Sequence, residues 1–175
     1  MKFEEVKISD LCDIKRISVS PIGGVRYFLY SFSAFDNNKK PELIDGSKIK
    51  SSKFKVLPNS ILFNKLNVKF LRVWSIGDNI EANSICSTEF IPLLPKESVS
   101  KEYLYYILTE KNFTYRMHSL RRGTSSSQQR ISPESLMNYV VRIPNKENQL
   151  RIAKILANLD NKIALNNAIN HNLQQ

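Results

Sequence analysis

The feature that most constrains the fold is a C-terminal run of helix-forming residues, which begins at Glu147 and contains neither glycine nor proline. Two series of side chains recur every seven residues in this run. They are Leu156, Ile163 and Asn170 in one series, and Ile152, Leu159, Asn166 and Leu173 in the other. The two series interleave at spacings of four and three, which is the a/d pattern of a coiled coil. The pattern predicts a long helix over residues 146–175.

A seam of this kind needs a partner, because a lone helix that projects from a domain cannot bury it. We therefore expect the seven seam positions to mediate dimerisation. Asn166 and Asn170 weaken such a seam but help to fix its register and orientation. The alternative is that the seam packs back against its own domain. The pattern runs to Gln175 without a helix-ending signal, so we expect either a longer native chain or a frayed last turn.

Basic residues are concentrated in two tracts that contain no Asp or Glu. The chain has 26 Lys and Arg against 16 Asp and Glu, a formal net charge of +10, with seven basic residues in 46–77 and five in 111–133. A solvated face normally intersperses acidic neighbours, so this separation favours a surface that faces phosphates. The candidate contacts in the first tract are Asn64, Lys65, Asn67, Lys69 and Arg72. The lysines of residues 48–55 are expected to act only through their charge.

The second tract contains the stretch HSLRRGTSSSQQRIS, residues 118–132, in which almost every side chain donates hydrogen bonds and none is a carboxylate. Ordered elements are predicted close on both sides, so we interpret the stretch as a short loop rather than a linker. Arginine can neutralise phosphates or bind guanine, glutamine can pair with adenine, and hydroxyls can bond either. The candidate contacts here are Arg121, Arg122, Thr124, Ser125, Ser126, Gln128, Gln129 and Arg130.

Residues 1–145 are typical of a mixed, strand-rich domain, so the predicted fold class is α+β with a long C-terminal helix. Strands are predicted over 25–35, 56–66, 68–76 and 84–95, and Pro92 and Pro95 place the end of the last one at a sheet edge. A helix is predicted from an N-cap at Ser100 to about residue 119. A short helix follows from Ser132 and Pro133, and then a strand that Pro144 ends.

Motifs for catalysis, cofactors or metals are not found. The sequence has no phosphate-binding loop, dinucleotide-binding turn or nucleophile elbow. Cys12 and Cys86 lie too far apart for a typical metal site and are expected to be reduced core residues, and His118 and His171 have no evident nucleophile partner. The N-terminus lacks the apolar run of a signal peptide and no segment is long enough to span a membrane, so a cytoplasmic protein is expected.

Two other functional classes remain open from the residues alone. The fragments Asp13-Ile14-Lys15 and Asp160-Asn161-Lys162 leave the possibility of a small metal-dependent nuclease, although Asp-x-Lys is common by chance. The basic tracts could instead meet an acidic protein in a scaffold without a nucleic-acid role. Magnesium-dependent cleavage distinguishes the first alternative, and partner binding that is indifferent to nucleic acid distinguishes the second.

The order of these parts resembles the specificity subunit of type I restriction–modification systems. The segments are LPNSILFNK, then KEYLYYIL, then RRGTSSSQQRISPESLMNYVVRIP, then NQLRIAKILANLDNKIALNNAINHNL. The most specific positions are Pro144, Gln149, Ile152-Ala153, Leu159-Asp160 and Ile163. The family usually has Glu before the Gln, and this chain has Asn148 there, which puts only the role of that carboxylate in doubt.

The resemblance implies a DNA target recognition domain, residues 1–145, joined to a conserved spacer helix, residues 146–175. Specificity subunits of this family carry two such domains, each of which reads half of a split DNA sequence, and two antiparallel helices set the distance between them. Methyltransferase subunits dock on this scaffold and a motor-nuclease subunit joins for cleavage. This chain resembles half of such a subunit, non-catalytic and without cofactors, and we expect it to form a homodimer or to pair with a second half.

Overall fold

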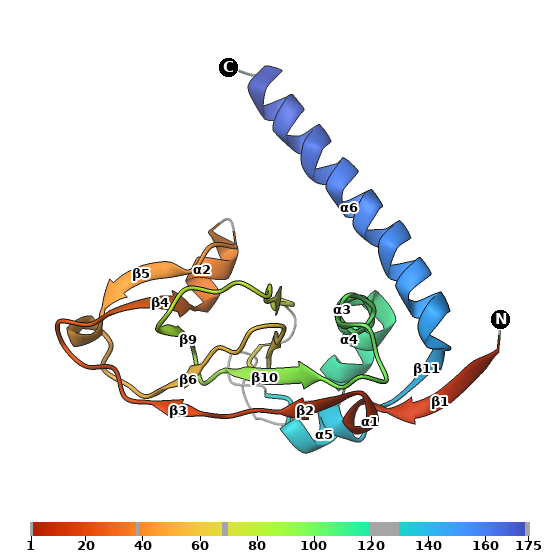
Figure 1. The fold of residues 1–175 in the computed structure, drawn as a ribbon, viewed down its shortest axis with the longest axis horizontal. Helices are drawn as coiled ribbons and strands as arrows, with labels where there is room; N and C mark the ends of the chain where they lie inside the picture. Colours follow the sequence, from red (N-terminus) through yellow and green to blue (C-terminus); the bar gives the residue numbers. More distant parts are fainter. Residues whose placement is uncertain (1, 38, 68–69, 120–129, 174–175) are drawn as a thin grey trace.

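The computed structural model describes residues 2–37, 39–67, 70–119 and 130–173, and the predicted α+β class is confirmed. Figure 1 shows an elongated body of strands with α1, α3, α4 and α5 gathered at one end and α2 toward the other. The long helix α6 leaves the first end and projects away from the strands. The N-terminal strand lies beside the base of α6.

The strands form three sheets. One has the order β2-β10-β7-β8, with bounds Cys12–Ile14, Phe90–Pro95, Ile61–Asn64 and Val73–Ser75. Another has the order β3-β6-β9-β4-β5, with bounds Ser18–Val19, Lys53–Lys55, Ser84–Cys86, Arg26–Tyr30 and Glu42–Asp45. The third pairs β1 (Phe3–Lys7) with β11 (Val140–Pro144). The pairs are antiparallel except for β4 with β9.

Helices α2, α3 and α5 begin where the sequence offers a serine as the N-cap. Their bounds are Ile8–Leu11 (α1), Phe32–Asp36 (α2), Lys101–Thr109 (α3), Lys111–Ser119 (α4), Pro133–Met137 (α5) and Lys146–Leu173 (α6), with a 3₁₀ turn at Gly46–Lys48. Ser100 accepts a hydrogen bond from the Tyr103 amide, and Ser132 accepts one from the Ser135 amide, which confirms both predicted N-caps. None of the helices in the described residues combines the length and apolar character needed to cross a membrane.

The four-stranded sheet is buried on both of its faces. Along β7, Ile61 and Phe63 face the larger core, which also includes side chains of α1, α3, α4, α5 and the base of α6. Leu62 faces the smaller core with Trp74, whose ring meets Tyr30 and Phe35 edge-on. The alternation follows from the two-residue period of a strand. This central sheet therefore provides a rigid support for the loop that joins β7 to β8.

Two predicted elements are wrong in extent. Residues 84–95 form two strands in different sheets, and β10 lies between β2 and β7 rather than at an edge. Pro92 is tolerated in this inner strand because it lies just beyond the residues of β10 that pair with β2. Its carbonyl accepts a hydrogen bond from the Lys15 amide, but no backbone donor is required of Pro92 on that side. The predicted helix from Ser100 to about residue 119 is divided at Glu110, whose extended backbone ends α3 and whose carboxylate caps α4.

The remaining predicted strands are present but shorter. The run 25–35 ends as a strand at Tyr30, because Ser31 caps α2 by accepting from the Ala34 amide. The runs 56–66 and 68–76 contain the short strands β7 and β8. Because both strands are shorter than predicted, a long connection joins β7 to β8, and it carries part of the first basic tract.

Candidate nucleic-acid interface

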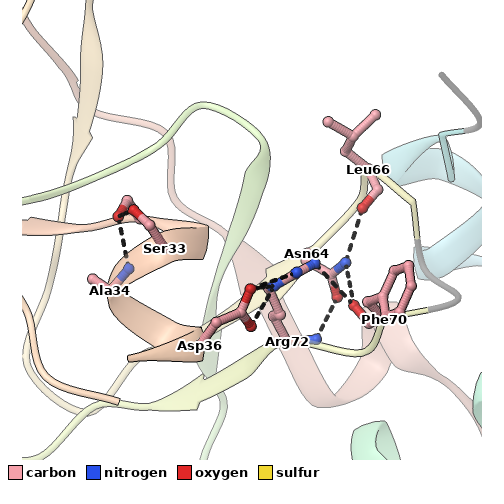
Figure 2. Close-up of polar contacts among 8 residues, drawn as sticks. Ser33, Ala34, Asp36, Asn64, Leu66, Phe70 and Arg72 are labelled. Carbon is pink, nitrogen blue, oxygen red and sulfur yellow. Dashed lines mark hydrogen bonds and ion pairs between the residues drawn. The ribbon is translucent and has the colours of Figure 1, made fainter. Parts of the chain in front are cut away.

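The connection between β7 and β8 is closed by the side chain of Asn64 (Figure 2). Its amide nitrogen donates to the carbonyls of Leu66 at 3.0 Å and Phe70 at 3.2 Å, and its amide oxygen accepts from the Arg72 backbone at 2.9 Å. Asn64 is 0% exposed. Every bond that its amide makes here holds the loop together, so this geometry corrects the expectation that Asn64 reads a base edge.

Arg72 leaves the same loop and is held by an acid from elsewhere in the chain. Its guanidinium donates to both carboxylate oxygens of Asp36, at 2.9 Å and 2.6 Å, and lies 4.9 Å from the ring centre of Phe32. These hydrogen bonds lower the pKa of Asp36 below its usual value. With its side chain only 16% exposed, Arg72 is oriented toward the protein and braces the loop rather than offering a free cation.

The two basic tracts meet directly beyond Asn64. Leu66 and Arg130 form an antiparallel bridge, and the Ile131 amide donates to the Lys65 carbonyl at 2.9 Å. The Lys65 amide in turn donates to the carbonyl of Glu89, at 3.0 Å. Two positions about sixty residues apart in the sequence, one in each tract, are therefore joined by backbone hydrogen bonds.

Glu89 lies at this junction and pairs with the arginine that closes the second tract. The Nε and one terminal nitrogen of Arg130 donate to the two carboxylate oxygens of Glu89, each at 3.2 Å. The hydrogen bonds with Glu89 raise the pKa of Arg130 above the usual value for arginine. Half of the Arg130 side chain is exposed, so the pair is accessible to solvent and is weaker than a buried one.

The structure therefore divides the predicted contacts into three groups. Asn64 and Arg72 support the loop, and Arg130 is paired but exposed. Lys65 and Asn67 are partly exposed beside the junction, and Asn67 has a positive φ of 50° that turns the chain. The other predicted contacts lie outside the described residues: Lys69, Arg121, Arg122, Thr124, Ser125, Ser126, Gln128 and Gln129.

Three residues of this region were not predicted from the sequence. Asp36 and Glu89 lie outside both acid-free tracts, and only the fold brings them to Arg72 and Arg130. Phe70 was assigned to a strand but lies in the loop and is 55% exposed. Its position two residues from Arg72 in a segment rich in basic residues was the one local signal available.

The base of α6 is fixed to the rest of the fold by Gln149. Its side chain accepts from the Ser100 amide at 3.0 Å and donates to the carbonyls of Pro144 at 3.0 Å and Ser98 at 3.4 Å. Gln149 is buried, and Ala153 is buried one turn later. The glutamine that carried the resemblance therefore joins the start of α6 to the start of α3 and the end of β11.

Farther along α6 the predicted seam changes from partly buried to exposed. Ile152 and Leu156 are partly buried, whereas Leu159 is 51% and Ile163 58% exposed. Asn166 and Asn170 are exposed as well, and the side chain of Leu173 lies outside the description. The alternative that the helix packs back on its own domain holds for Ile152 and Leu156 and fails from Leu159 onward among the seam positions whose side chains are described.

The fragments that suggested a nuclease have other contacts. Asp13 lies 3.4 Å from the ammonium of Lys96 and 3.7 Å from that of Lys15, and Asp160 accepts a hydrogen bond from the Tyr106 hydroxyl at 2.8 Å. Among the residues described, no three His, Cys, Asp or Glu side chains are grouped as metal ligands would be. The arrangement does not favour the nuclease alternative. Cys12 and Cys86 are buried and unpaired with each other, as expected.

Comparisons with known proteins agree with the resemblance in the sequence. The type I restriction modification DNA specificity domain family matches residues 1–175. The type I restriction enzyme HindI specificity subunit of Haemophilus influenzae is 32% identical over 99 residues, which are 56% of this chain and 22% of that protein.

Solved structures share the fold at lower identity. The HsdS subunit of Thermoanaerobacter tengcongensis has a TM-score of 0.74 at 19% identity and covers 93% of this chain, and the type I S subunit of M. genitalium has 0.62 at 19% over 93%. A chain from a study of complex assembly and conformational transition in a type I R-M system has 0.76 at 18% over 94%. The alignments span 43%, 40% and 44% of those chains, so this chain corresponds to less than half of each. Because the family match extends over the whole sequence, the chain belongs to the type I restriction modification DNA specificity domain family.

Proposed function

We propose that this chain is a non-catalytic DNA recognition component of a type I restriction–modification system and that it reads one half of a split target in double-stranded DNA. Family membership supports the class of function. The observation that carries the assignment to a surface is the bridge between Leu66 and Arg130, which joins the two acid-free basic tracts at one place. In the sequence, the proposed contacts lie close to Leu66 or to Arg130.

The loop supports and the DNA contacts have separate roles in this proposal. Asn64 and Arg72 hold the β7–β8 loop in shape, and Lys65 and Asn67 remain for phosphates or bases. Arg130 can exchange its exposed bond with Glu89 for a bond to phosphate, because a surface ion pair in water stabilises a protein by only about 0–1 kcal/mol. Arg121, Arg122, Thr124, Ser125, Ser126, Gln128 and Gln129 supply the remaining proposed contacts, with Lys69.

The proposed partners follow from the helix that leaves the domain. We assign residues 1–145 to target recognition and 146–175 to a spacer that pairs with the same helix of a second copy or of a second specificity half. Ile155, Leu159 and Ile163 expose apolar side chains on α6 without a covering element in the described chain. Methyltransferase subunits and a motor-nuclease subunit are the proposed enzymatic partners, in the cytoplasm.

The test requires the target, which can be obtained by sequencing the methylated sites of a host that carries the intact system. Duplexes with the site and with a scrambled site are then titrated with the protein at several salt concentrations. We expect tighter binding to the site and a steep loss of affinity with salt, because phosphate contacts release counterions. Arg121→Ala with Arg122→Ala should cost at least about 1 kcal/mol of binding free energy.

A matched control separates contacts from total charge. Lys48→Ala with Lys50→Ala also removes two positive charges. These two lysines lie at and just after the 3₁₀ turn that follows β5. It should weaken binding much less than the arginine pair. Equal losses from the two double variants would reduce the interface to non-specific charge, and salt-insensitive binding of an acidic protein instead of DNA would favour the scaffold alternative.

A further inference from the structure

Glu89 is an acidic residue at the point where the two basic tracts meet. Its carbonyl accepts a hydrogen bond from the Lys65 amide at 3.0 Å, and its own amide donates to the Ser87 hydroxyl at 3.3 Å. Its carboxylate accepts from Nε and from one terminal nitrogen of Arg130, each at 3.2 Å. Both the backbone and the side chain of Glu89 are therefore bound at this junction.

The backbone of Arg130 is attached to the same junction. Arg130 forms an antiparallel bridge with Leu66, and the next residue, Ile131, donates its amide hydrogen to the Lys65 carbonyl at 2.9 Å. Ile131 is 1% exposed and belongs to the larger core. The carboxylate and the guanidinium thus extend from backbone segments that are hydrogen-bonded to residues 65 and 66. A pair that is anchored on both sides restrains the plane of the guanidinium.

Arg72 and Arg130 make the same kind of pair but differ in what the rest of the guanidinium meets. Arg72 also uses Nε and one terminal nitrogen for its acid, Asp36, but its other terminal nitrogen donates to the Phe70 carbonyl at 3.4 Å. Its side chain is 16% exposed, against 50% for Arg130. Because a guanidinium is planar, the edge between its two terminal nitrogens points away from an acid bound at Nε. Arg130 therefore keeps one donor edge directed away from Glu89.

This edge matches the acceptors of a guanine in the major groove. Arginine binds O6 and N7 of guanine through two parallel hydrogen bonds. An arginine that a carboxylate already holds loses less rotamer freedom when it binds a base. If Arg130 left Glu89 for a phosphate instead, the carboxylate would remain unpaired beside the negatively charged duplex, and like charges repel. A base contact lets Arg130 bind DNA and keep its acid.

We propose that Glu89 is a positioning residue that holds Arg130 for bidentate recognition of one guanine in the target half-site. The inference rests on the proposed function and deepens it, because it assigns Arg130 to a base instead of a phosphate. Glu89 does not touch the DNA in this arrangement and acts through Arg130. Exchange of the Glu89 pair for a phosphate is the competing outcome of the test.

The experiment uses the full chain assembled with its methyltransferase subunits and the duplex that carries the methylated site. Each guanine of the half-site is replaced in turn by 7-deazaguanine, which keeps base pairing but lacks the N7 acceptor. At one position this replacement should weaken binding of the wild-type protein about 5-fold or more. Arg130→Lys keeps the charge but not the two parallel donors, so it should lose the response to 7-deazaguanine at that position.

Glu89→Gln tests the positioning role, because glutamine keeps the size of the side chain but not its charge. The ratio of affinities for the site and for a scrambled duplex should fall about 5-fold or more, and the response to 7-deazaguanine should disappear. The slope of log affinity against log salt should steepen by up to about 0.9, since a released Arg130 can neutralise a phosphate. Asp13→Asn removes the same charge from exposed ion pairs with Lys15 and Lys96, and this control should bind as the wild type does.

The outcomes distinguish this inference from the function on which it rests. If the wild-type protein does not prefer the site over a scrambled duplex, the proposed function fails and the role of Glu89 fails with it. If the wild type is specific but the half-site has no guanine whose N7 matters to Arg130, only the role of Glu89 is refuted.

Two results with Glu89→Gln also refute the positioning role. Tighter binding to both duplexes would mean that Arg130 exchanges its acid for a phosphate. An equal loss on both duplexes would assign Glu89 to the folding of the junction. Thermal unfolding identifies any variant that fails to fold, and in that case the 7-deazaguanine series with the wild type and Arg130→Lys decides whether Arg130 reads a guanine.

Discussion

The two halves of α6 carry the same heptad pattern but differ in what surrounds them. Up to Asp160 the helix is joined to the strand-rich part of the chain through Gln149, Ala153 and the bond from Tyr106. Beyond Asp160 every residue whose side chain is described is exposed. A periodic sequence therefore predicts that a helix has an apolar side, but it does not predict which molecule covers each part of that side.

The two kinds of contact also use different faces of the helix. At 3.6 residues per turn, Gln149, Ala153 and Asp160 cluster on one face, and Ile155, Leu159 and Ile163 on another about a quarter of a turn away. The first face carries the hydrogen bonds of Gln149 and Asp160 and the buried Ala153, whereas the second is apolar and exposed. The base of α6 can therefore be fixed to its own domain while the apolar face remains available to a partner helix.

The largest expected effect is on association through the exposed apolar face of α6. Leu159→Lys with Ile163→Lys removes two half-exposed apolar side chains from each copy, and each offers about 1 kcal/mol on further burial. Over two copies the loss is on the order of 4 kcal/mol, or about 1000-fold in the dimer dissociation constant. Light scattering should give about twice 20.2 kDa for the wild type and a single chain for the variant.

The unfolding free energy of the separated chain should barely respond to the same double change. A wild-type protein that stays monomeric at high concentration would instead mean that the helix requires a second, different half. A double variant that unfolds much more easily as a monomer would contradict the distinction between the two halves of α6.

The next largest effect tests the fixed half. Gln149→Met keeps the volume of the side chain but leaves the Ser100 amide and the Pro144 carbonyl without their buried partner. Unsatisfied buried groups cost about 1–3 kcal/mol each, so the unfolding free energy should fall by about 3 kcal/mol in urea titrations. Asn161→Met, the same kind of replacement in the exposed half, should change it by less than about 0.5 kcal/mol.

Two alanine positions on α6 test how tightly each half of the helix is packed, rather than its hydrogen bonds. Ala153 is buried, so Ala153→Leu overfills its site and should cost about 2 kcal/mol of unfolding free energy. Ala164 is exposed, and Ala164→Leu should be nearly neutral because leucine and alanine are both good helix formers. Equal effects in thermal denaturation would show that both halves are packed in solution.

The features that local chemistry determines were predictable from the sequence. Ser100 and Ser132 are N-caps because each is followed by helix formers within reach of its hydroxyl, and that requirement spans only three residues. The break at Glu110 was not predictable in the same way. Glutamate is a good helix former, and its extended backbone reflects the packing of α3 and α4 against the shared core rather than its own preference.

The candidate interface shows the same limit in its charges. The acid-free tracts are visible in the sequence, but the acids that pair with their arginines come from α2 and from the residue just before β10, more than thirty residues away. A charge count over neighbours along the chain cannot include Asp36 or Glu89. The burial of Asn64 is equally tertiary, since it depends on the two cores that cover both faces of the sheet containing β7.

The smallest expected effect lies at the boundary between the two halves of α6. The Tyr106 hydroxyl donates to Asp160 at 2.8 Å, and burial, reinforced by the carboxylate, raises the pKa of Tyr106. Because the folded-state pKa is raised, the contribution of the protonated hydroxyl is fully present below the ordinary tyrosine pKa of about 10 and is lost as pH rises above it.

Tyr106→Phe should cost about 0.5 kcal/mol at pH 7, since the bond is solvent-accessible. Urea titrations at pH 7 and pH 10.5 measure both effects. The wild type should lose more stability between these values than the variant does, because phenylalanine has no proton to release. An identical pH dependence of the two proteins would mean that the joint between α3 and α6 depends on Gln149 and Ala153 alone, and that the fixed half of the helix ends about two turns earlier.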